Sequence, residues 1–457
     1  MDIMKQREEE IYNAIKSGKL TVSVIGLGRM GLPLACLFAD AGANVIGVDI
    51  NRRIVDSINN GKCPLNGEGL EMLIGKFVKE GRLSATDNAC DAASKSEVII
   101  IIVPTLVNQE NEPDYTAVEK ACKDIGLGLN AGSLVIFEST VGPGVTEELV
   151  KPVLEAGSKL KAGADFGLAY SPLRGTAGRV LNDLQNYPRI VAGLNEQSLR
   201  VAKAVLSTIV KSRIICVSDI KTAEATKLFE NVYRDVNIAL VNELAIFCEK
   251  IGVDFKEIKN AANSQPYCHL HDPGIGVGGH CIPVNPYFLI EKAYDIDAKV
   301  DLVKLARKAN DYMPKHTIKL IIKALKECRK SIRRAKIVIF GISYKSNVGE
   351  ARNSPAQQVI ELLKQKGIKT VIYDPYFAKE ELEELGYVAA TKPERAAEKA
   401  DCILITVAHD DFKKINLRDL ARVMKKPAAV IDGCRILSPS DVKEVGLLYY
   451  GIGYGGK

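Results

Sequence analysis

The sequence predicts an α/β protein with two Rossmann-like, doubly wound domains joined by a long central helix. Strand-like apolar runs alternate with helical runs through the first half of the chain, and this alternation returns after Arg334. Between the two regions, residues 221–252 lack internal glycine and proline and carry apolar residues at three-to-four spacing, which indicates one helix. At 457 residues the chain is too long for one compact core. We expect domains at 1–215, 216–325 and 326–457.

The expected elements follow from apolar runs bounded by turn residues. Strands of the first domain are predicted at 21–26, 44–49, 97–103, 133–138, 166–170 and 189–192. Further helical stretches are predicted at 300–310 and 317–328. In the last domain we expect strands at 335–342, 369–375, 402–409 and 428–434, with a helix from Pro355.

A glycine-rich turn follows the first predicted strand. Residues 21–31 read TVSVIGLGRMG, and Asp49 ends the next strand about twenty residues later, as in dinucleotide-binding folds. Gly26 permits the tight turn, Gly28 lets a pyrophosphate approach the backbone, and Gly31 lets helix and strand pack closely. The helix N-terminus offers free N–H groups to the phosphates, and Asp49 can accept hydrogen bonds from the ribose. The turn and Asp49 therefore predict an NAD site. Arg52 and Arg53, just beyond Asp49, leave NADP possible.

Two other strand ends are expected to line the nicotinamide pocket, because ligands bind at the carboxyl ends of strands in such sheets. Thr105 ends the VPT motif, and Thr140 lies within FESTVGPG. The predicted cofactor-binding residues are Gly26, Gly28, Arg29, Met30, Gly31, Asp49, Thr105 and Thr140.

One cysteine lies in a loop that is built to expose it. Residues 274–287 read GIGVGGHCIPVNPY, with Cys281 behind two glycines and ahead of two prolines. Glycines allow close approach to a ligand, and prolines stiffen the exit from the turn. Cys281 is therefore a candidate covalent nucleophile. A buried structural cysteine is the alternative, and the glycine density argues against it.

Zinc is a further possibility for this region, because Cys268, His269, His271 and His280 lie close to Cys281. A zinc-bound Cys281 would leave the glycine turn unexplained. We therefore expect no metal, and interpret His271 and His280 as substrate contacts or loop hydrogen-bonders.

The long helix carries polar residues on one face. Lys227, Asn231 and either Arg234 or Asp235 are spaced to lie together. A solvated stripe is an equally good interpretation of this spacing. The functional interpretation is an ammonium and an amide that stabilise a developing oxyanion. The same helical block is apolar on more than one side, which suggests a dimer surface.

Bulk properties exclude several functions. A net charge of +6 is small for this length and gives no support for nucleic-acid binding. The longest apolar run, 98–103, is too short for a membrane span, and the charged N-terminal segment lacks a signal-peptide core. Eleven cysteines without CxxC pairs indicate a reducing compartment. We expect a cytoplasmic protein with no membrane or nucleic-acid partner.

Several motifs, taken in order, resemble the UDP-glucose/GDP-mannose dehydrogenase family over about residues 21–432. They are GLGRMGLPLA, VPT, ESTVGPG, YSP, AEATKLFEN, NELA, GIGVGGHCIP, ARKANDYMP, GISYKSNVGEARNSPA, YDP and DG. The segment GGHCIPVNPYFL is similar to the branch that acts on UDP-N-acetylhexosamines. The resemblance implies a homodimer or higher homo-oligomer and a last domain that binds the UDP-sugar.

The resemblance also implies a four-electron, NAD-dependent oxidation of the sugar C6 alcohol to a carboxylate through a thioester. UDP-N-acetylmannosamine is the expected substrate; the glucosamine and galactosamine epimers and UDP-glucose remain alternatives. The implied catalytic residues are Cys281, Lys227, Asn231 and Thr140. The implied substrate-binding residues are Arg174, Lys227, Asn231, His271, Gly278, His280, Lys345 and Arg352.

The chain departs from the family pattern at Leu173 and Asn285, where the family usually has Glu and Asp, and at Val284. An amide cannot take a proton at neutral pH, so the general base is left among Lys227, His280 and Glu138. Two other functions stay open. The first is a two-electron β-hydroxyacid dehydrogenase, which explains Lys227 but neither the cysteine loop nor the second α/β domain. The second is a regulator that binds NAD and a nucleotide sugar without catalysis, which explains Leu173 and Asn285 in place of acids.

Overall fold

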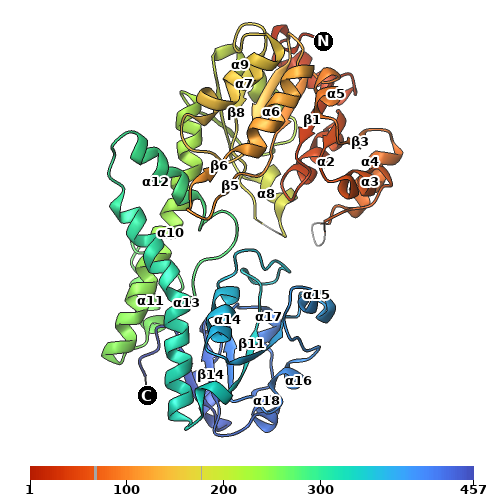
Figure 1. The fold of residues 1–457 in the computed structure, drawn as a ribbon. Coiled ribbons are helices and arrows are strands. Elements are labelled where there is room, and N and C mark those ends of the chain that lie inside the picture. Colours follow the sequence, from red (N-terminus) through yellow and green to blue (C-terminus); the bar gives the residue numbers. More distant parts are fainter. Residues whose placement is uncertain (66–68, 177, 457) are drawn as a thin grey trace. The chain divides into compact units, whose positions relative to one another are not determined.

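The computed structural model describes residues 1–65, 69–176 and 178–456, which divide into two compact units. The first unit contains Met1–Glu230 and Tyr287–Ala298, and the second contains Asn231–Pro286 and Lys299–Lys457. Helix α10 (Ile220–Ile251) begins in the first unit and continues into the second (Figure 1). The predicted long helix at 221–252 is confirmed.

The first unit is built on an eight-stranded sheet in the order β10-β9-β8-β7-β4-β1-β2-β3. Neighbouring strands are parallel except for the antiparallel pair β8 and β9. The strands are β1 (Thr21–Ile25), β2 (Asn44–Val48), β3 (Leu83–Thr86), β4 (Val98–Ile101), β7 (Leu134–Phe137), β8 (Gly167–Tyr170), β9 (Arg189–Gly193) and β10 (Ile214–Cys216). A separate antiparallel pair is formed by β5 (Leu106–Val107) and β6 (Pro113–Asp114).

Helices cover both faces of this sheet. They are α1 (Glu8–Lys16), α2 (Gly31–Ala41), α3 (Arg52–Asn59), α4 (Glu71–Lys79), α5 (Ala89–Ser94), α6 (Thr116–Gly128), α7 (Lys151–Ser158), α8 (Val180–Asn186) and α9 (Glu196–Ser207), with short turns of helix at η1 (Ile3–Lys5) and η2 (Thr146–Val150). Helix α12 (Asn285–Asp295) lies mostly in this unit. Alternate residues of β4 enter two separate apolar cores, because successive side chains of a strand point to opposite faces.

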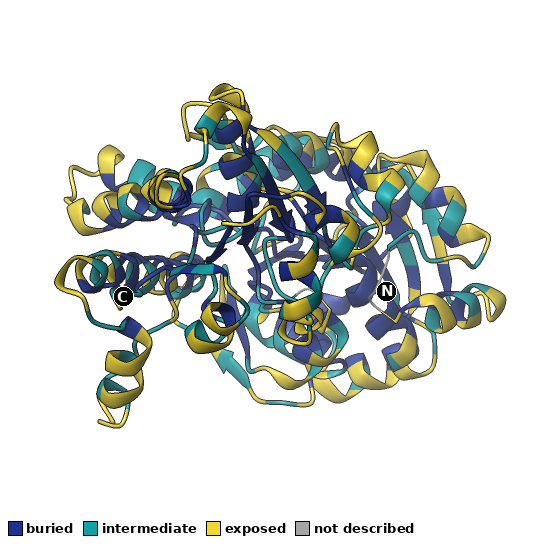
Figure 2. Cartoon of the chain, turned by 90° about the horizontal axis from the view of Figure 1, so that it is seen from below, coloured by how far each residue is buried: buried dark blue, intermediate teal, exposed yellow. Residues whose placement is uncertain are grey.

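The second unit contains a five-stranded parallel sheet in the order β12-β11-β13-β14-β15. The strands are β11 (Lys336–Phe340), β12 (Lys369–Tyr373), β13 (Cys402–Ile405), β14 (Ala429–Asp432) and β15 (Leu448–Gly451). The helices are α11 (Phe255–Ala262), α13 (Asp301–Glu327), α14 (Pro355–Gln365), α15 (Lys379–Glu384), α16 (Pro393–Ala397), α17 (Asp410–Lys413), α18 (Leu417–Val423) and α19 (Pro439–Glu444), with η3 (Ile332–Arg334). Figure 2 shows the buried strands and the exposed outer faces of the helices in each unit.

The structure confirms the two Rossmann-like sheets and corrects one helix. The two stretches predicted at 300–310 and 317–328 form a single helix, α13, that runs through Pro314. Proline inside a helix removes a backbone hydrogen-bond donor, and the two predicted stretches lie on either side of Pro314. Here Met313 and Ile321 lie fully buried on either side of Pro314, and this burial offsets the lost hydrogen bond.

Candidate active site

The glycine turn after β1 has the geometry of a phosphate cradle. Gly26 has φ +103°, and a Cβ on Gly31 would lie 1.8 Å from the carbonyl oxygen of Gly26. Gly28 is exposed, and a Cβ there would meet no atom within 4 Å. Helix α2 starts at Gly31 with no acidic residue in its first turn. The turn therefore leaves space and free N–H groups for a pyrophosphate, so these residues fit NAD.

Two backbone hydrogen bonds hold the carboxylate of Asp49 in place. Its Oδ2 accepts the N–H of Leu27 at 3.0 Å, and its Oδ1 accepts the N–H of Asn51 at 2.9 Å. Each carboxylate oxygen keeps a further lone pair for a ribose hydroxyl. Arg52, one of the two residues that could attract a 2′-phosphate, is paired with Asp87 at 2.9 Å.

The two threonines predicted for the nicotinamide pocket are brought together. The hydroxyl of Thr105 donates to the carbonyl of Thr140 at 2.6 Å, and the hydroxyl of Ser139 donates to Val103 at 2.6 Å. These bonds join the segments that follow β4 and β7, which are neighbours in the sheet. Both threonines are half-buried at the strand ends where such sheets bind ligands.

Glu224, on the first turns of α10, holds the segment that follows Thr140. Its carboxylate accepts the N–H groups of Gly144 at 2.6 Å and Thr146 at 2.9 Å, and the Thr146 hydroxyl at 2.6 Å. Burial raises the pKa of Glu224 to about 7, against the lowering effect of these hydrogen bonds. Sequence reasoning missed this residue, because its partners lie about eighty positions away along the chain.

Lys227 lies one turn further along α10. Its Nζ donates to the carbonyl oxygen of Leu173 at 2.7 Å. The adjacent Arg174 is paired with Glu230 and donates to the Pro188 carbonyl at 3.1 Å. The guanidinium of Arg174 is largely neutralised by the Glu230 carboxylate.

Glu138 is enclosed rather than presented to a ligand. Its side chain is fully buried and paired with Arg189, which also donates to Ser171 at 2.7 Å. Burial raises the pKa of Glu138 to about 7, and Arg189 opposes that shift. Glu138 is thus a buried partner of Arg189, and it stays one of the three candidates for the general base.

In the second unit, Asn231 contacts the cysteine loop. Its Nδ2 donates to Oδ1 of Asn285 at 3.0 Å, and both side chains are buried. Of the two residues proposed for the next position on this face, Asp235 is fully buried, whereas Arg234 is exposed. The polar face of α10 therefore continues through Asp235.

The glycines of the cysteine loop are required by close packing. Gly279 has φ +90°, and a Cβ there would lie 2.7 Å from the Tyr344 ring. At Gly278 a Cβ would lie 2.7 Å from the Pro355 side chain. Asn353 donates to the carbonyl of Gly279 at 3.2 Å. The loop thus lies against the segment that contains the predicted ligands Lys345 and Arg352.

Cys281 and His280 are half-buried neighbours in this loop. A hydrogen bond to the Cys281 side chain raises the pKa of His280, with burial opposing the shift. A protonated imidazole next to a sulfur stabilises the thiolate, which is the nucleophilic form. The Nδ1 atom of His280 is buried and has no hydrogen-bond partner among the described residues. The pair therefore places a titratable imidazole beside the candidate nucleophilic thiol.

Asp374 directly follows β12, the second strand along the sequence of its unit, as Asp49 directly follows β2 in the first unit. Its Oδ2 accepts the N–H groups of Ile342 at 2.8 Å and Ser343 at 3.1 Å and contacts His409 at 3.4 Å. The carboxylate is buried and its acceptor sites face the protein. Asp374 is therefore not available to a ribose. The turn after β11 presents Lys345, which is half-buried.

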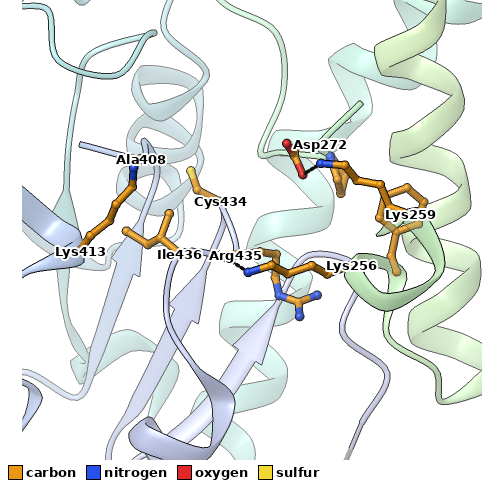
Figure 3. Close-up of a pocket in the computed structure, with 10 residues that line it drawn as sticks. Lys256, Lys259, Asp272, Ala408, Lys413, Cys434, Arg435 and Ile436 are labelled. Carbon is orange, nitrogen blue, oxygen red and sulfur yellow. Dashed lines mark hydrogen bonds and ion pairs between the residues drawn. The ribbon is translucent and has the colours of Figure 1, made fainter. Parts of the chain in front are cut away.

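A basic pocket of about 410 Å³ opens in the second unit (Figure 3). Lys256 and Lys259 of α11, Lys413 of α17 and Arg435 after β14 line it together with Asp272. Lys259 is paired with Asp272 at 2.5 Å, and Lys256 donates only to a carbonyl, that of Arg435, at 3.2 Å. Lys413 is in turn paired with Asp410 at 2.8 Å and Arg435 with Asp254 at 2.7 Å, so carboxylates offset the charge of three of the four lining cations. The predicted contact His271 directly precedes Asp272. The lysines were missed because they lie in separate segments.

The described residues contain no group of three or more His, Cys, Asp or Glu side chains placed to hold a metal ion. None of the eleven cysteines, all of which are described, is joined in a disulfide. Across the described ranges, we find no helix with the length and apolar character needed to span a membrane.

Comparison with known proteins gives consistent matches along the chain. Three family models match: the NAD binding domain of the UDP-glucose/GDP-mannose dehydrogenase family at residues 20–212, its central domain at 221–312 and its UDP binding domain at 338–439. The UDP-N-acetyl-D-mannosamine dehydrogenase of Pyrococcus horikoshii is 34% identical over 95% of this chain and 100% of its own. The NDP-N-acetyl-D-galactosaminuronic acid dehydrogenase of Ralstonia solanacearum is 34% identical over 88% of this chain and 94% of its own.

Solved structures agree with these matches. The structure of UDP-D-ManNAc dehydrogenase from Pyrococcus horikoshii has a TM-score of 0.87 and 34% identity, covering 96% of this chain and 100% of that one. An NDP-N-acetyl-D-galactosaminuronic acid dehydrogenase from Methanosarcina mazei has a TM-score of 0.83 and 30% identity, covering 98% of each chain.

Proposed function

Since the chain belongs to the UDP-glucose/GDP-mannose dehydrogenase family, and is thus an NAD-dependent UDP-sugar dehydrogenase, we propose that it oxidises C6 of UDP-N-acetylmannosamine to a carboxylate. The observation that carries the chemistry is the Cys281–His280 pair, held in a glycine loop against the segment with Lys345. The names of the relatives support an N-acetylhexosamine substrate and leave the galactosamine epimer as the second candidate.

The reaction balances as one alcohol, two NAD and one water giving one carboxylate, two NADH and three protons. When bound, NAD accepts the hydride that leaves C6 at each of the two oxidations. The Cys281 sulfur adds to the aldehyde carbon and forms a thiohemiacetal, whose oxidation gives a thioester. Water then adds to the thioester carbonyl, the carbon–sulfur bond breaks, and the thiol is restored.

The remaining residues have roles that follow from their surroundings. Lys227 and Asn231 stabilise the oxyanion at C6, because an ammonium and an amide N–H both favour developing negative charge. His280 takes the thiol proton and later a proton of the attacking water, and Thr140 orients that water. This assignment supplies a base in a chain with Leu173 and Asn285 in place of acids.

Binding of the UDP group is assigned to the second unit, whose residues 338–439 match the UDP binding domain. Lys345 and Arg352 hold the substrate beside the cysteine loop, with contributions from Gly278 and His271, and Arg174 remains a weaker candidate because Glu230 occupies it. Lys256 of the basic pocket is a further candidate contact for the diphosphate, because the other three lining cations are paired with carboxylates, as Arg174 is.

A substrate panel with quantitative NADH detection tests the proposal. We expect turnover with UDP-N-acetylmannosamine at two NADH per uronate, and weaker turnover with the glucosamine and galactosamine epimers and with UDP-glucose. One NADH per product would instead favour a two-electron hydroxyacid dehydrogenase. No turnover with any UDP-sugar, together with tight binding of NAD and the nucleotide, would favour the regulator.

The assembly is proposed as a homodimer formed through α10. Five large apolar side chains along this helix are each at least 47% exposed: Phe229, Tyr233, Leu240, Phe247 and Ile251. Their spacing of four or seven places them on one stripe. A second copy with the same stripe can cover it by two-fold symmetry.

The absence of disulfides among the cysteines supports a reducing compartment, and we assign the cytoplasm.

A further inference from the structure

The cysteine loop is held by α10 at both ends. After the cysteine, Asn231 donates to the side chain of Asn285, as described above. Before it, the N–H of Gly274 donates to Oδ1 of Asn242 at 3.0 Å. Asn242 is fully buried and lies eleven residues beyond Asn231, about three helical turns. The loop that presents Cys281 therefore has two attachment points on one rigid element.

A buried polar chain stands behind the second attachment. Nδ2 of Asn242 donates to Oδ1 of Asn310 at 2.9 Å, and Nδ2 of Asn310 donates to Oδ1 of Asp235 at 2.8 Å and to its carbonyl at 3.0 Å. Arg307 pairs with the same Asp235 oxygen at 2.5 Å. All four side chains are less than 5% exposed, so water does not replace these partners.

The Asp235 carboxylate fixes the orientation of the two amide side chains in this series of hydrogen bonds. An ionised carboxylate only accepts hydrogen bonds, so Asn310 must turn its amide nitrogen toward Asp235 and its oxygen toward Asn242. Asn242 must then turn its nitrogen toward Asn310, which leaves its oxygen facing the N–H of Gly274. Rotation of either amide would place two donors or two acceptors against each other in a buried site.

We propose that Asn242 is a positioning residue for Cys281, oriented through Asn310 by the Asp235–Arg307 pair. This proposal rests on the thioester chemistry above. Without the hydrogen bond from Gly274 to Asn242, the start of the loop can shift. The Cys281 sulfur is then no longer positioned next to the aldehyde carbon. A displacement of about 1 Å in a reacting group costs about 100-fold in rate. The aldehyde then escapes before the second oxidation.

Asn242→Leu tests this directly, because leucine has a similar volume but neither donates nor accepts. Leu420→Ala is the control: Leu420 is a buried residue of α18 in a different apolar core, and its truncation destabilises the fold without touching the loop. Both variants are assayed with UDP-N-acetylmannosamine, with hydroxylamine present to trap free aldehyde. Asn242→Ser, which is too short to reach Gly274 but disturbs the core less, serves if the leucine variant does not fold.

For the Asn242 variants we expect trapped aldehyde, an NADH-to-uronate ratio above two, and alkylation of Cys281 by iodoacetamide at an altered rate, as read by peptide mass spectrometry. The control keeps a ratio of two even where its active fraction is lower, since a merely structural loss does not divert the intermediate. A ratio of two without trapped aldehyde in folded Asn242 variants overturns the inference. A wild-type enzyme that yields one NADH overturns the proposed function instead.

Discussion

The sulfur of Cys281 is the atom through which the proposed second oxidation proceeds. We expect Cys281→Ser to lose uronate formation by at least about 10³-fold, because a serine hydroxyl next to His280 is a far weaker nucleophile than a thiolate. The measurement is uronate by chromatography together with NADH by absorbance. Cys268→Ser, a half-buried cysteine thirteen positions earlier, is the matched control and should keep full activity. Normal uronate formation by Cys281→Ser would rule out the covalent scheme.

Gly279 is required both for its backbone conformation and for its packing. Gly279→Ala should lower activity by more than about tenfold, because the methyl group would displace Tyr344 or the loop, and a 1 Å shift at a reacting group is costly. Gly367→Ala is the control: φ is +72° there, but a Cβ would meet no neighbour. Gly367→Ala should lose about 1 kcal/mol of unfolding free energy from backbone strain, and Gly279→Ala should lose more because its methyl group also meets Tyr344, as read by urea denaturation. Equal activities of the two variants would contradict the packing argument.

Residues of the site differ in how far the sequence could predict them. Gly26, Gly28 and Asp49 act through local backbone geometry, so a short motif identifies them. Glu224 and Asn242 act through partners that are distant along the chain, at separations of about eighty and thirty-two residues. No local pattern marks such pairs, and both residues resemble ordinary polar positions of a long helix.

Among the elements, the segment at η2 depends on the protonation of Glu224. The pKa of Glu224 rises from 4.5 to about 7 on folding, because the side chain becomes buried. Between these pH values the folded protein therefore binds more protons than the unfolded chain. Stability therefore falls as the pH rises from about 4.5 to about 7. We expect Glu224→Gln to flatten this part of the profile of melting temperature against pH, measured by calorimetry.

The control is Glu8→Gln, an exposed acidic residue of α1 that is not among the groups acting on the pKa of Glu224, and it should keep the wild-type slope. Glu138 shows the same raised pKa in the same unit and should preserve part of the slope in both variants. A slope in Glu224→Gln as steep as that of the wild type would show that this carboxyl is not the titrating group.

Strand prediction failed mainly at sheet edges. The strands without a sequence prediction are β3, β10 and β15, which each end one of the two larger sheets, and the short pair β5 and β6. Edge strands are covered on fewer sides, and β3 and β10 accordingly contain partly exposed residues, whereas β4, β7 and β8 are buried throughout. Apolar runs reveal strands that are buried on both faces. The same logic explains α13, where a local rule about proline was outweighed by the burial of both flanking turns.

On the scale of the whole molecule, two similar sheets differ in the turns and carboxylates that follow their first two strands. The first unit has glycines and an accessible Asp49, whereas the second encloses Asp374 and presents Lys345. A dinucleotide fits the first arrangement, and a monophosphate or diphosphate fits the second. The division into domains at 1–215, 216–325 and 326–457 stays a prediction, since the two compact units divide the long helix between them.

The apolar stripe of α10 leads to a prediction about assembly. Leu240→Glu with Phe247→Glu would place two carboxylates in the proposed interface, where their burial costs several kcal/mol. Wild type should sediment at twice the mass of one chain, and the double variant at the mass of one. Met72→Glu, at a more exposed apolar residue of α4, is the control and should stay dimeric. A monomeric wild type, or a dimeric double variant, would contradict the assignment of this helix as the interface.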